Sequence, residues 1–360
     1  MTAPHKSDQL ICISIIIPVY NVELYIRQCI ESIIEQETCQ ASLECLIVDD
    51  CTPDSSMDIV HSIVDDYNGP IHFVFLKHVH NRGLSAARNT AINVATGDYI
   101  LFVDSDDMLK PGAISCFIEA LKNNGGNDVD VVMGNFIYNK TNRRMQFDQD
   151  TPFFLDNTDE SALLLLLSQK IRHNAWNKLV KKEFFTEQQL YFREGIINED
   201  LLWTYLLFRQ MKNIVIIPDI THIYNEYNTN SITNTSDKRA KKTIESRIII
   251  FNTILDNPPR LQASRTDYYS YILFFLVKTI DTFESNKNLT SDYLENLRSL
   301  KVRFLKDVWK NRLYLFYFFS LIIVKPFSHL LCLRLYRRHF WKILETTVSL
   351  QKRLTCSANH

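Results

Sequence analysis

Three carboxylates stand within four residues, at Asp104, Asp106 and Asp107. Because like charges at this spacing repel one another, a folded protein gathers them mainly where a cation can hold them. Carboxylate oxygens suit Mg²⁺ or Mn²⁺, and these ions usually bind the phosphates of a substrate as well. A solvated acidic turn before a helix near Pro111 would have the same composition. The tetrapeptide alone therefore leaves a metal site and an acidic turn open.

A second acidic residue, Asp50, ends another apolar run of the chain. A carboxylate at this position can accept a hydrogen bond from a ribose hydroxyl or from the N–H of a pyrimidine ring. The alternative is a helix N-cap, for which Asp54 and Ser55 are better placed. The residue type favours nucleotide recognition without deciding between the two.

A third segment, residues 81–89, places Gly83 before a run of small side chains that ends in Arg88 and Asn89. Small residues allow a helix to approach a sheet closely. The guanidinium of Arg88 can reach a carboxylate or a phosphate. An isolated arginine on a helix lies more commonly at the surface, so both outcomes stay open here.

The elements that must position these residues alternate between strand and helix. Apolar runs predict four strands, at 12–17, where Pro18 should stop the strand, 43–48, 71–76 and 99–103. Helical spacing of apolar residues predicts three helices, at 23–35, 55–67 and 85–95. This alternation indicates an α/β fold with a mainly parallel, doubly wound sheet. Right-handed crossovers place the carboxyl ends of such strands on one rim, where open sheets bind ligands. Residues 18–21, 49–50 and 104–106 should therefore converge there.

The pattern changes along the rest of the chain. It predicts a helix at 111–124, a strand at 129–133, a helix at 159–169, and strands at 214–217 and 220–225. From about 237 onward the sequence is almost entirely helical in pattern. A polar stretch at 228–238 suggests a boundary near 235, with one domain at 1–235 and a helical region at 236–360.

Composition limits the function classes. The chain has 360 residues, 46% of them hydrophobic, and a formal net charge of −1, which argues against general nucleic-acid binding. Residues 301–360 nevertheless carry twelve Lys or Arg and two acids, whereas residues 1–300 carry 28 basic and 39 acidic side chains. The eight cysteines form no C-x-x-C pair, and without a secretory signal we expect reduced thiols in the cytoplasm.

No membrane-spanning segment is predicted. The longest nearly unbroken apolar stretch, 313–324, has twelve residues, and a bilayer span needs about 20. Residues 309–341 mix aromatic and aliphatic side chains with Lys and Arg, which is typical of a helix lying in an anionic membrane interface. A packed helical region with a solvated basic face is the alternative.

Taken in order, the motifs resemble the signature of family-2 glycosyltransferases, in particular those of bacterial surface-polysaccharide synthesis. The matching segments are 18–21, 48–50, 81–89, 102–107, 174–179 and 192–200. They carry the resemblance from about residue 13 to 235. It implies the GT-A (nucleotide-diphospho-sugar transferase) fold, with nucleotide-sugar binding in 11–110 and the acceptor and catalytic part in 111–235.

The resemblance also implies roles for individual residues. Those expected to bind the donor are Pro18, Tyr20, Glu23, Asp50, Arg88, Asp104 and Ser105. Asp104 and Asp106 would form the Asp-x-Asp pair that holds Mg²⁺ or Mn²⁺, with Asp106 as the direct ligand and Asp104 facing the ribose or the metal. Those expected to support the site or face the acceptor are Asp107, Trp176, Lys178 and Glu199. Asp200 would be the catalytic base.

These roles fit inverting transfer of a single sugar from a nucleotide-sugar, most simply a UDP-sugar, to a glycan or a lipid-linked glycan. A base opposite the leaving diphosphate implies one displacement with inversion. The Arg-Trp motif of processive synthases is absent from the sequence. One departure is that 223–232 has no basic residue before Ser231-Ile232 to hold the diphosphate. Neutralisation would then fall to the metal and to Lys178, Arg82 or His222.

His222 is also open as a third metal ligand, although an ordinary strand histidine is the simpler interpretation. Two alternative functions stay open: a sugar-phosphate nucleotidyltransferase, and a degenerate transferase acting as a scaffold. A nucleotidyltransferase would require a Gly-rich, Arg-containing loop after the first strand, which residues 18–21 do not provide. The expected location is the cytoplasm, peripheral on the inner face of the cytoplasmic membrane.

Overall fold

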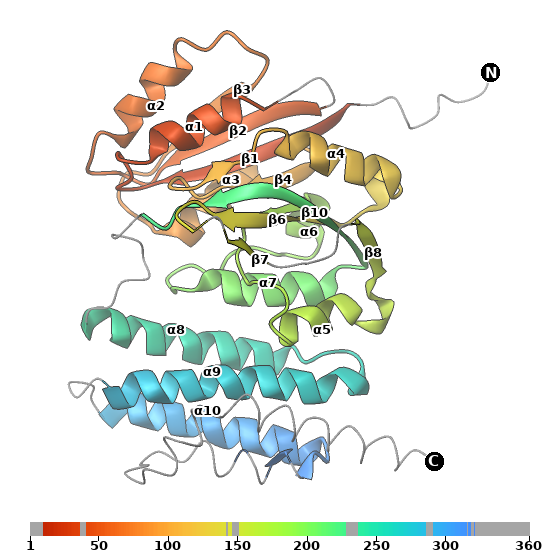
Figure 1. Ribbon diagram of the computed structural model, residues 1–360. Helices are drawn as coiled ribbons and strands as arrows, with labels where there is room; N and C mark the ends of the chain where they lie inside the picture. Colours follow the sequence, from red (N-terminus) through yellow and green to blue (C-terminus); the bar gives the residue numbers. More distant parts are fainter. Residues whose placement is uncertain are drawn as a thin grey trace. The chain divides into compact units, whose positions relative to one another are not determined.

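The computed structural model describes residues 10–36, 41–141, 143–145, 151–227, 237–285, 291–314, 316–317 and 320. The chain divides into two compact units. The first comprises residues 1–162, 172–195 and 199–234, and the second comprises 163–171, 196–198 and 235–360. Figure 1 shows the elements of both units along the chain.

The described part of the first unit is built on one sheet of ten strands. These are β1 (Ile11–Val19), β2 (Ala41–Asp49), β3 (His72–Lys77), β4 (Tyr99–Phe102), β5 (Met108–Leu109), β6 (Val131–Tyr138), β7 (Arg144–Met145), β8 (Phe153–Asp156), β9 (Lys178–Lys181) and β10 (Asn213–Tyr224). Their order is β3-β2-β1-β4-β9-β6-β10-β5, with β7 on β6 and β8 on β10. The long ladders, β3-β2-β1-β4 and β6-β10, are parallel, and β9 joins them by antiparallel pairing.

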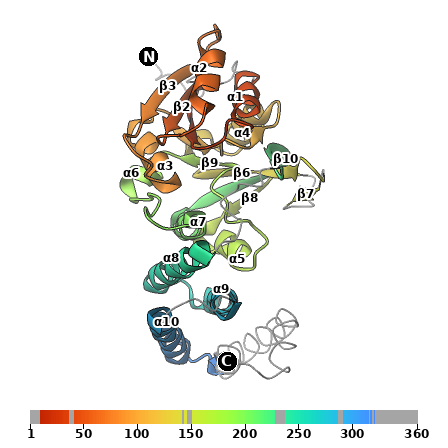
Figure 2. The same cartoon turned by 90° about the vertical axis from the view of Figure 1, so that its left-hand side faces the viewer.

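Helices lie on both faces of this sheet. The α-helices up to residue 210 are α1 (Ile26–Ile34), α2 (Ser56–Val64), α3 (Leu84–Val94), α4 (Ala113–Asn123), α5 (Ser161–Leu167), α6 (Glu183–Glu187) and α7 (Glu199–Gln210), with 3₁₀ turns η2 (Gly126–Asp128) and η3 (Asn157–Asp159); residues 163–167 of α5 belong to the second unit. Ile13, Ile15 and Ile17 of β1 pack in the core with residues of α1 and α4. On the opposite face, Phe102 contacts Phe185 of α6 and Trp203 of α7 edge to face. Figure 2 shows α1 and α4 on one side of the sheet and α3 and α6 on the other. The predicted α/β fold with a flanked, mostly parallel sheet is confirmed.

Two strand predictions are corrected by the structure. β1 does not stop before Pro18 but continues through it to Val19. Pro18 has no N–H to donate to a neighbouring strand. The pairing of β1 with β4 already ends at Ile16 and Phe102, so Pro18 leaves no hydrogen bond of that ladder unmade. The two strands predicted at 214–217 and 220–225 are one strand, β10, whose pairing with β6 shifts register between Ile216 and His222. The break reflects Pro218, which cannot donate to a ladder.

The glycine that precedes β4 has a steric reason. A Cβ on Gly97 would lie 2.6 Å from the Ser14 backbone nitrogen, so only glycine allows this close approach to β1. Its N–H donates to Ser14 Oγ at 2.9 Å. The turn before β4 is therefore fixed against the centre of the sheet, and this sets where Asp104 leaves it.

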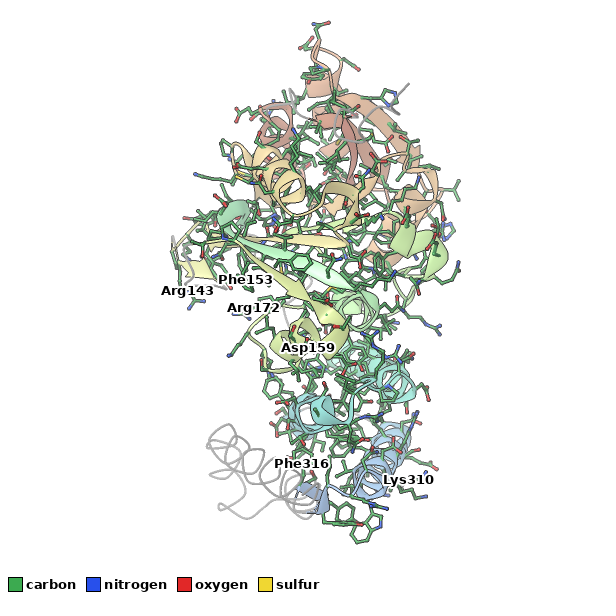
Figure 3. The ribbon with its side chains drawn as sticks, turned by 90° about the vertical axis from the view of Figure 1, so that its right-hand side faces the viewer. Arg143, Phe153, Asp159, Arg172, Lys310 and Phe316 are labelled. Atoms are coloured by element: carbon green, nitrogen blue, oxygen red, sulfur yellow. The ribbon has the colours of Figure 1, made fainter. Side chains whose placement is uncertain are left out.

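The second unit is helical in its described part, with α8 (Asp237–Asp256), α9 (Arg265–Ser285), α10 (Ser291–Lys310) and the 3₁₀ turn η4 (Gln262–Ser264). Figure 3 labels Lys310 at the end of α10 and Phe316 beyond it. No helix within the described ranges combines the length and apolar character needed to cross a bilayer. Residues 321–360 lie outside the described residues, and most of the predicted membrane-binding segment with them. The described cysteines, Cys12, Cys29, Cys45, Cys51 and Cys116, carry free thiols.

Candidate active site

The predicted polar segments converge at the carboxyl edge of the parallel strands. Val19 of β1 pairs with Asp49 of β2, and the Asp50 N–H donates to the Val19 carbonyl at 3.0 Å. Beside them, the Val103 N–H donates to the Ile16 carbonyl at 3.0 Å, so Asp104 leaves the sheet on the same edge. The register of β1 with its two neighbours thus brings together residues that lie up to 88 positions apart in the sequence, from Ile16 to Asp104.

Arg88 joins Asp104 to the start of α7. The arginine is only 2% exposed, and its Nη2 donates to Asp104 Oδ1 at 2.6 Å while its Nη1 donates to Glu199 Oε1 at 2.9 Å. The two carboxylates raise the pKa of the guanidinium against the opposing effect of burial. The Asp104 cluster and the Glu199–Asp200 pair therefore belong to one site.

Asp200, the predicted base, lies next to this network in the first turn of α7. Burial raises the pKa of its carboxyl to about 7, and repulsion from Glu199 adds to the effect, whereas Arg88 opposes it. A carboxylate with a pKa near the working pH is well matched to accepting a proton. The environment of Asp200 therefore suits the role of a general base.

Lys178 on β9 is a buried counterpart to Asp200. Its Nζ donates to the carbonyl of Asn174 at 2.6 Å, and its side chain is fully buried. Burial lowers the pKa of this amine to about 7, and the charge of Asp200 acts in the opposite direction. The geometry makes Lys178 a supporting residue behind the site, because its amine is bonded to the backbone of its own loop.

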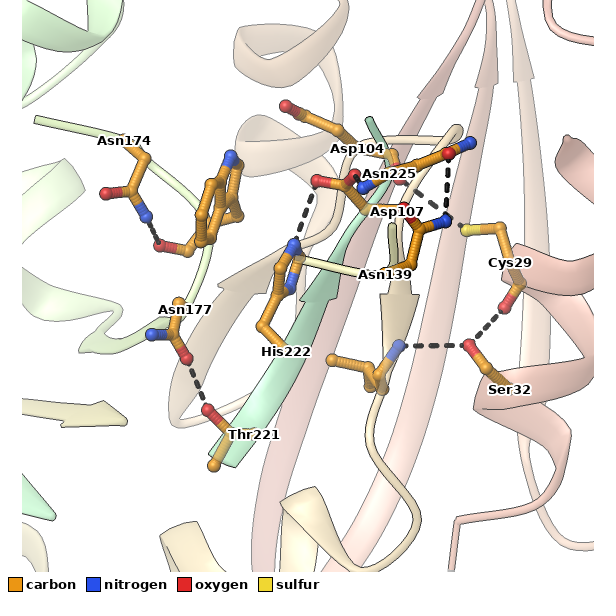
Figure 4. Close-up of polar contacts among 12 residues, drawn as sticks. Cys29, Ser32, Asp104, Asp107, Asn139, Asn174, Asn177, Thr221, His222 and Asn225 are labelled. Carbon is orange, nitrogen blue, oxygen red and sulfur yellow. Dashed lines mark hydrogen bonds and ion pairs between the residues drawn. The ribbon is translucent and has the colours of Figure 1, made fainter. Parts of the chain in front are cut away.

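Asp107 contacts the end of β10 and the residue that follows it. Its Oδ1 accepts the Asn225 N–H at 2.8 Å and its Oδ2 lies 2.9 Å from His222 Nε2 (Figure 4). Burial raises the pKa of Asp107 well above its usual range and lowers the pKa of His222 to about 3. Of the two predicted roles, support of the loop is the one for which the structure provides contacts.

His222 is held on a second side by Trp176. The two rings stack with centroids 4.2 Å apart and planes within 6°, and both side chains are buried. Tyr224 stacks on the indole at 5.7 Å. His222 is thus an enclosed strand residue bonded to Asp107, and Trp176 packs against it in the interior rather than lining an open surface.

Asp50 is the most heavily hydrogen-bonded of the predicted donor residues. Its Oδ1 accepts the Arg82 N–H at 2.8 Å and lies 2.6 Å from His78 Nδ1, and its Oδ2 accepts the Gly83 N–H at 2.7 Å. A carboxylate offers about four acceptor positions, so about one is left for a ligand. Asp50 therefore shapes the 78–83 loop whatever else it contacts.

Most of the remaining residues predicted to bind the donor lie in or next to the loop between β1 and α1. Tyr20 is 46% exposed, and Pro18 is buried within β1. Glu23 accepts the Ser55 N–H at 3.1 Å, and its own N–H donates to Asp54 Oδ2 at 2.9 Å. These bonds tie the loop after β1 to the loop after β2. Ser105 is buried next to Asp104.

Sequence reasoning assigned no role to three of the residues that hold the site. Asn89 exchanges two hydrogen bonds of 2.9 Å with the backbone of Phe192, and so fixes the segment before α7 to α3. His78 and Asn225 bond Asp50 and Asp107 as described above. Asn89 stands inside the 81–89 motif, which could have drawn attention to it, whereas His78 and Asn225 carry no pattern in the sequence.

The carboxylates of Asp104 and Asp106 suit a divalent metal ion that is bound together with a substrate. Mg²⁺ typically binds one or two carboxylates together with substrate phosphates, rather than a closed cage of side chains. Asp104 has one oxygen bonded to Arg88 and its side chain is 27% exposed, and Asp106 stands two residues away. Within the described residues no group of three or more His, Cys, Asp or Glu forms a closed metal site. A metal held by Asp104 and Asp106 would therefore share its coordination with the phosphates.

Comparisons with known proteins identify similar glycosyltransferases. The family model described as "Glycosyl transferase family 2" matches residues 14–187. Glycosyltransferase GlyG of Streptococcus pneumoniae is 30% identical over 223 residues, which cover 59% of this chain and 70% of the relative. EpsJ of Bacillus subtilis, described as an uncharacterized glycosyltransferase, is 29% identical over 256 residues, 67% of this chain and 70% of the relative.

A third relative is named for its activity. Poly(ribitol-phosphate) beta-glucosyltransferase of Bacillus spizizenii is 31% identical over 215 residues, 59% of this chain but 32% of that protein. The chain thus spans about a third of this relative's length.

Two solved structures share the fold. TarS 1–349 of S. aureus in complex with UDP-GlcNAc has a TM-score of 0.61 at 19% identity, covering 82% of this chain and 80% of TarS 1–349. A mannosyltransferase from Pyrobaculum calidifontis, in complex with GDP-Man and Mn²⁺, has a TM-score of 0.54 at 12% identity, covering 96% and 88% of the two chains.

Proposed function

The chain belongs to glycosyl transferase family 2, and from this premise we propose that it transfers a single sugar, with inversion, from a nucleotide-diphospho-sugar to a hydroxyl of a glycan or lipid-linked glycan. The observation that carries the proposal is the meeting of two acidic motifs at Arg88. Asp104 and Glu199 stand 95 positions apart in sequence, yet both bond one buried guanidinium. The family assignment decides against the nucleotidyltransferase alternative.

Asp200 is the residue that takes the acceptor's proton in this proposal. Transfer requires a base on the face of the sugar opposite the leaving diphosphate, and such a group typically contributes about 10²–10⁴-fold to the rate. A carboxylate whose pKa lies at about 7 is largely ionised at slightly alkaline pH and still basic enough to accept a proton. One base and one displacement imply inversion at the anomeric carbon.

Asp106 and Asp104 would hold Mg²⁺ or Mn²⁺ against the diphosphate. When bound, such an ion neutralises the charge that develops on the leaving phosphate. Arg88 keeps one oxygen of Asp104 in place, and Asp107 anchors the end of the same turn through the Asn225 N–H. The protein thus fixes both sides of the turn on which Asp106 stands.

A UDP-sugar donor and an acceptor of the cell-surface polymer class are supported by the relatives. TarS is solved with UDP-GlcNAc, and one relative is named as a poly(ribitol-phosphate) glucosyltransferase. The proposed sugar is a hexose or an N-acetylhexosamine. The proposed place of action is the cytoplasmic face of the membrane, reached through the basic segment 309–341.

A screen of nucleotide-sugars tests this function. With Mn²⁺ present, the protein should release nucleoside diphosphate from one or a few donors and transfer the sugar to a glycan acceptor. We expect UDP-sugars to be turned over in preference to GDP-sugars. Intact donors across the whole screen, or release of a nucleoside monophosphate or triphosphate, would contradict the proposal. The donor screen needs no knowledge of the acceptor, because water can replace it slowly.

The rate should depend on pH through Asp200. Since the base must be ionised, kcat/KM for donor turnover should rise with pH through about 7 and then level off. The groups that face Asp200 are Glu199, Arg88, Asp104 and Lys178, and the amine of Lys178 titrates over the same range. Measuring the profile of Lys178→Met separates them. The rise should persist in this variant, and its disappearance there would assign it to the lysine.

A further inference from the structure

Arg88 makes two ion pairs at once, and they link two segments of the site. One Nη binds Asp104, two residues after the end of β4, and the other binds Glu199, the first residue of α7. The guanidinium also stands over the ring of Phe192, with its carbon 4.9 Å from the ring centroid. A planar guanidinium can bridge two carboxylates in a fixed geometry, which the point charge of a lysine cannot do.

The next residue of α3 strengthens the same connection. Asn89 accepts the Phe192 N–H through Oδ1 and donates through Nδ2 to the Phe192 carbonyl, each at 2.9 Å. Consecutive residues of one helix thus bind the segment before α7 and the first residue of α7. α3 is itself fixed at its start, because the Gly83 N–H donates to Asp50 at 2.7 Å.

The burial of Arg88 argues against a role in binding the donor phosphates directly. Its side chain is only 2% exposed, and both Nη atoms donate to carboxylates. Nε has no hydrogen-bond partner and is buried as well. The bonds to the carboxylates use two of the five N–H groups of the guanidinium, and the other three are enclosed with the rest of the side chain, so a phosphate could reach them only if the surrounding residues moved.

We propose that Arg88 is a positioning residue that holds the metal-binding turn at Asp104 and the base-bearing start of α7 at a fixed separation. This inference rests on the proposed function for its catalytic meaning. The reacting sugar must lie between the phosphates, held at Asp104 and Asp106, and the base Asp200. Arg88 therefore sets the gap across which transfer takes place.

Arg88→Lys tests this assignment, because it keeps the charge and loses the bridge. The expected kcat for donor turnover falls about 100-fold, the size of effect that misplacement by about 1 Å can have. The Kd for UDP in the presence of Mn²⁺ should change less than about threefold, because ground-state binding is kept. A rise in Kd of about tenfold or more would instead identify Arg88 as a phosphate ligand and overturn the proposal.

A double-mutant cycle with Glu199→Gln shows whether the arginine acts through Glu199. The double variant should be about as slow as Arg88→Lys alone, because both changes break the same contact. Additive losses would contradict a shared bridge. Arg303→Lys is the matched control, since Arg303 also donates from its two Nη atoms to two partners, Asn252 and Asp256, but in the second unit. It should keep wild-type kcat.

Amide hydrogen exchange provides a readout that is independent of turnover. In Arg88→Lys, the amides of Phe192 and of the first turn of α7 should exchange at least about tenfold faster, with the strands β1 and β2 unchanged. Unchanged exchange at these positions would overturn the positioning role. If the wild type turned over no donor, the proposed function would fail while this measurement still decided the role of Arg88.

Discussion

Replacing Asp200 with asparagine is expected to reduce kcat for sugar transfer by about 10²–10⁴-fold, the usual contribution of a general base. Asparagine has nearly the same shape and cannot accept the proton. Because the change leaves Asp104 and Asp106 in place, UDP should bind in the presence of Mn²⁺ with nearly unchanged affinity. Transfer kinetics together with UDP titration measure both quantities.

The same substitution should not destabilise the protein above neutral pH. The pKa of Asp200 is raised to about 7 in the folded state, and the unfolded value is about 4. The stability that this group contributes is therefore full below pH 4 and is lost as pH rises through 7. At pH 8, Asp200→Asn should show a melting temperature equal to or higher than that of the wild type. A slow variant with a lowered melting temperature would point to misfolding instead.

Glu199→Gln is the neighbouring comparison for this prediction. Glu199 is bonded to Arg88, whereas Asp200 makes no ion pair with it. We therefore expect the loss of rate to be larger in Asp200→Asn than in Glu199→Gln. If Glu199→Gln proved the slower of the two, the base would have been assigned to the wrong member of the pair.

Replacing Asp106 with asparagine should abolish metal-dependent turnover. Even residues that only support metal ligands typically cost about 10–100-fold in affinity or activity when replaced, so loss of a ligand should cost at least about 100-fold. The expected signature is a weakened Mn²⁺ affinity in the presence of UDP, measured by calorimetry or by the electron paramagnetic resonance of Mn²⁺. Added metal at high concentration should restore part of the rate.

Asp107→Asn is the matched control, because it makes the same change in the next residue. Asp107 is bonded to the Asn225 N–H and lies beside His222, so it should not be a ligand. An asparagine can still accept from Asn225 and donate to the imidazole. Mn²⁺ affinity should fall much less than in Asp106→Asn. Equal losses in the two variants would place the metal across the whole turn rather than at Asp106.

The rim of the sheet could be predicted from the sequence because it depends on local patterns. The buried run of β4 ends immediately before the acidic cluster, and parallel connectivity then brings Asp50 and Asp104 to the same edge. Pro18 misled the prediction of β1, since whether a proline ends a strand depends on whether a neighbour needs its N–H. The pairing of β4, which stops at Ile16, is not visible in the sequence of β1.

The partners of the site residues were harder to predict than the residues themselves. Arg88 meets Glu199 across 111 positions, and His222 meets Asp107 across 115. Such contacts depend on the packing of α3 against the sheet and on the pairing of β10 with β5 and β6, for which no local spacing gives a signal. The interpretation of Arg88 as a donor ligand therefore rested on its residue type alone, whereas its contacts are to two carboxylates.

The anomeric configuration of the sugar first released from an α-linked UDP-sugar tests the central claim most directly. Proton NMR spectra recorded before mutarotation distinguish the two anomers for the wild type with Mn²⁺. Attack from the side of Asp200, opposite the diphosphate, predicts that the β anomer appears first and that its formation is slowed in Asp200→Asn. Initial release of the α anomer, or an unchanged rate in Asp200→Asn, would contradict the account.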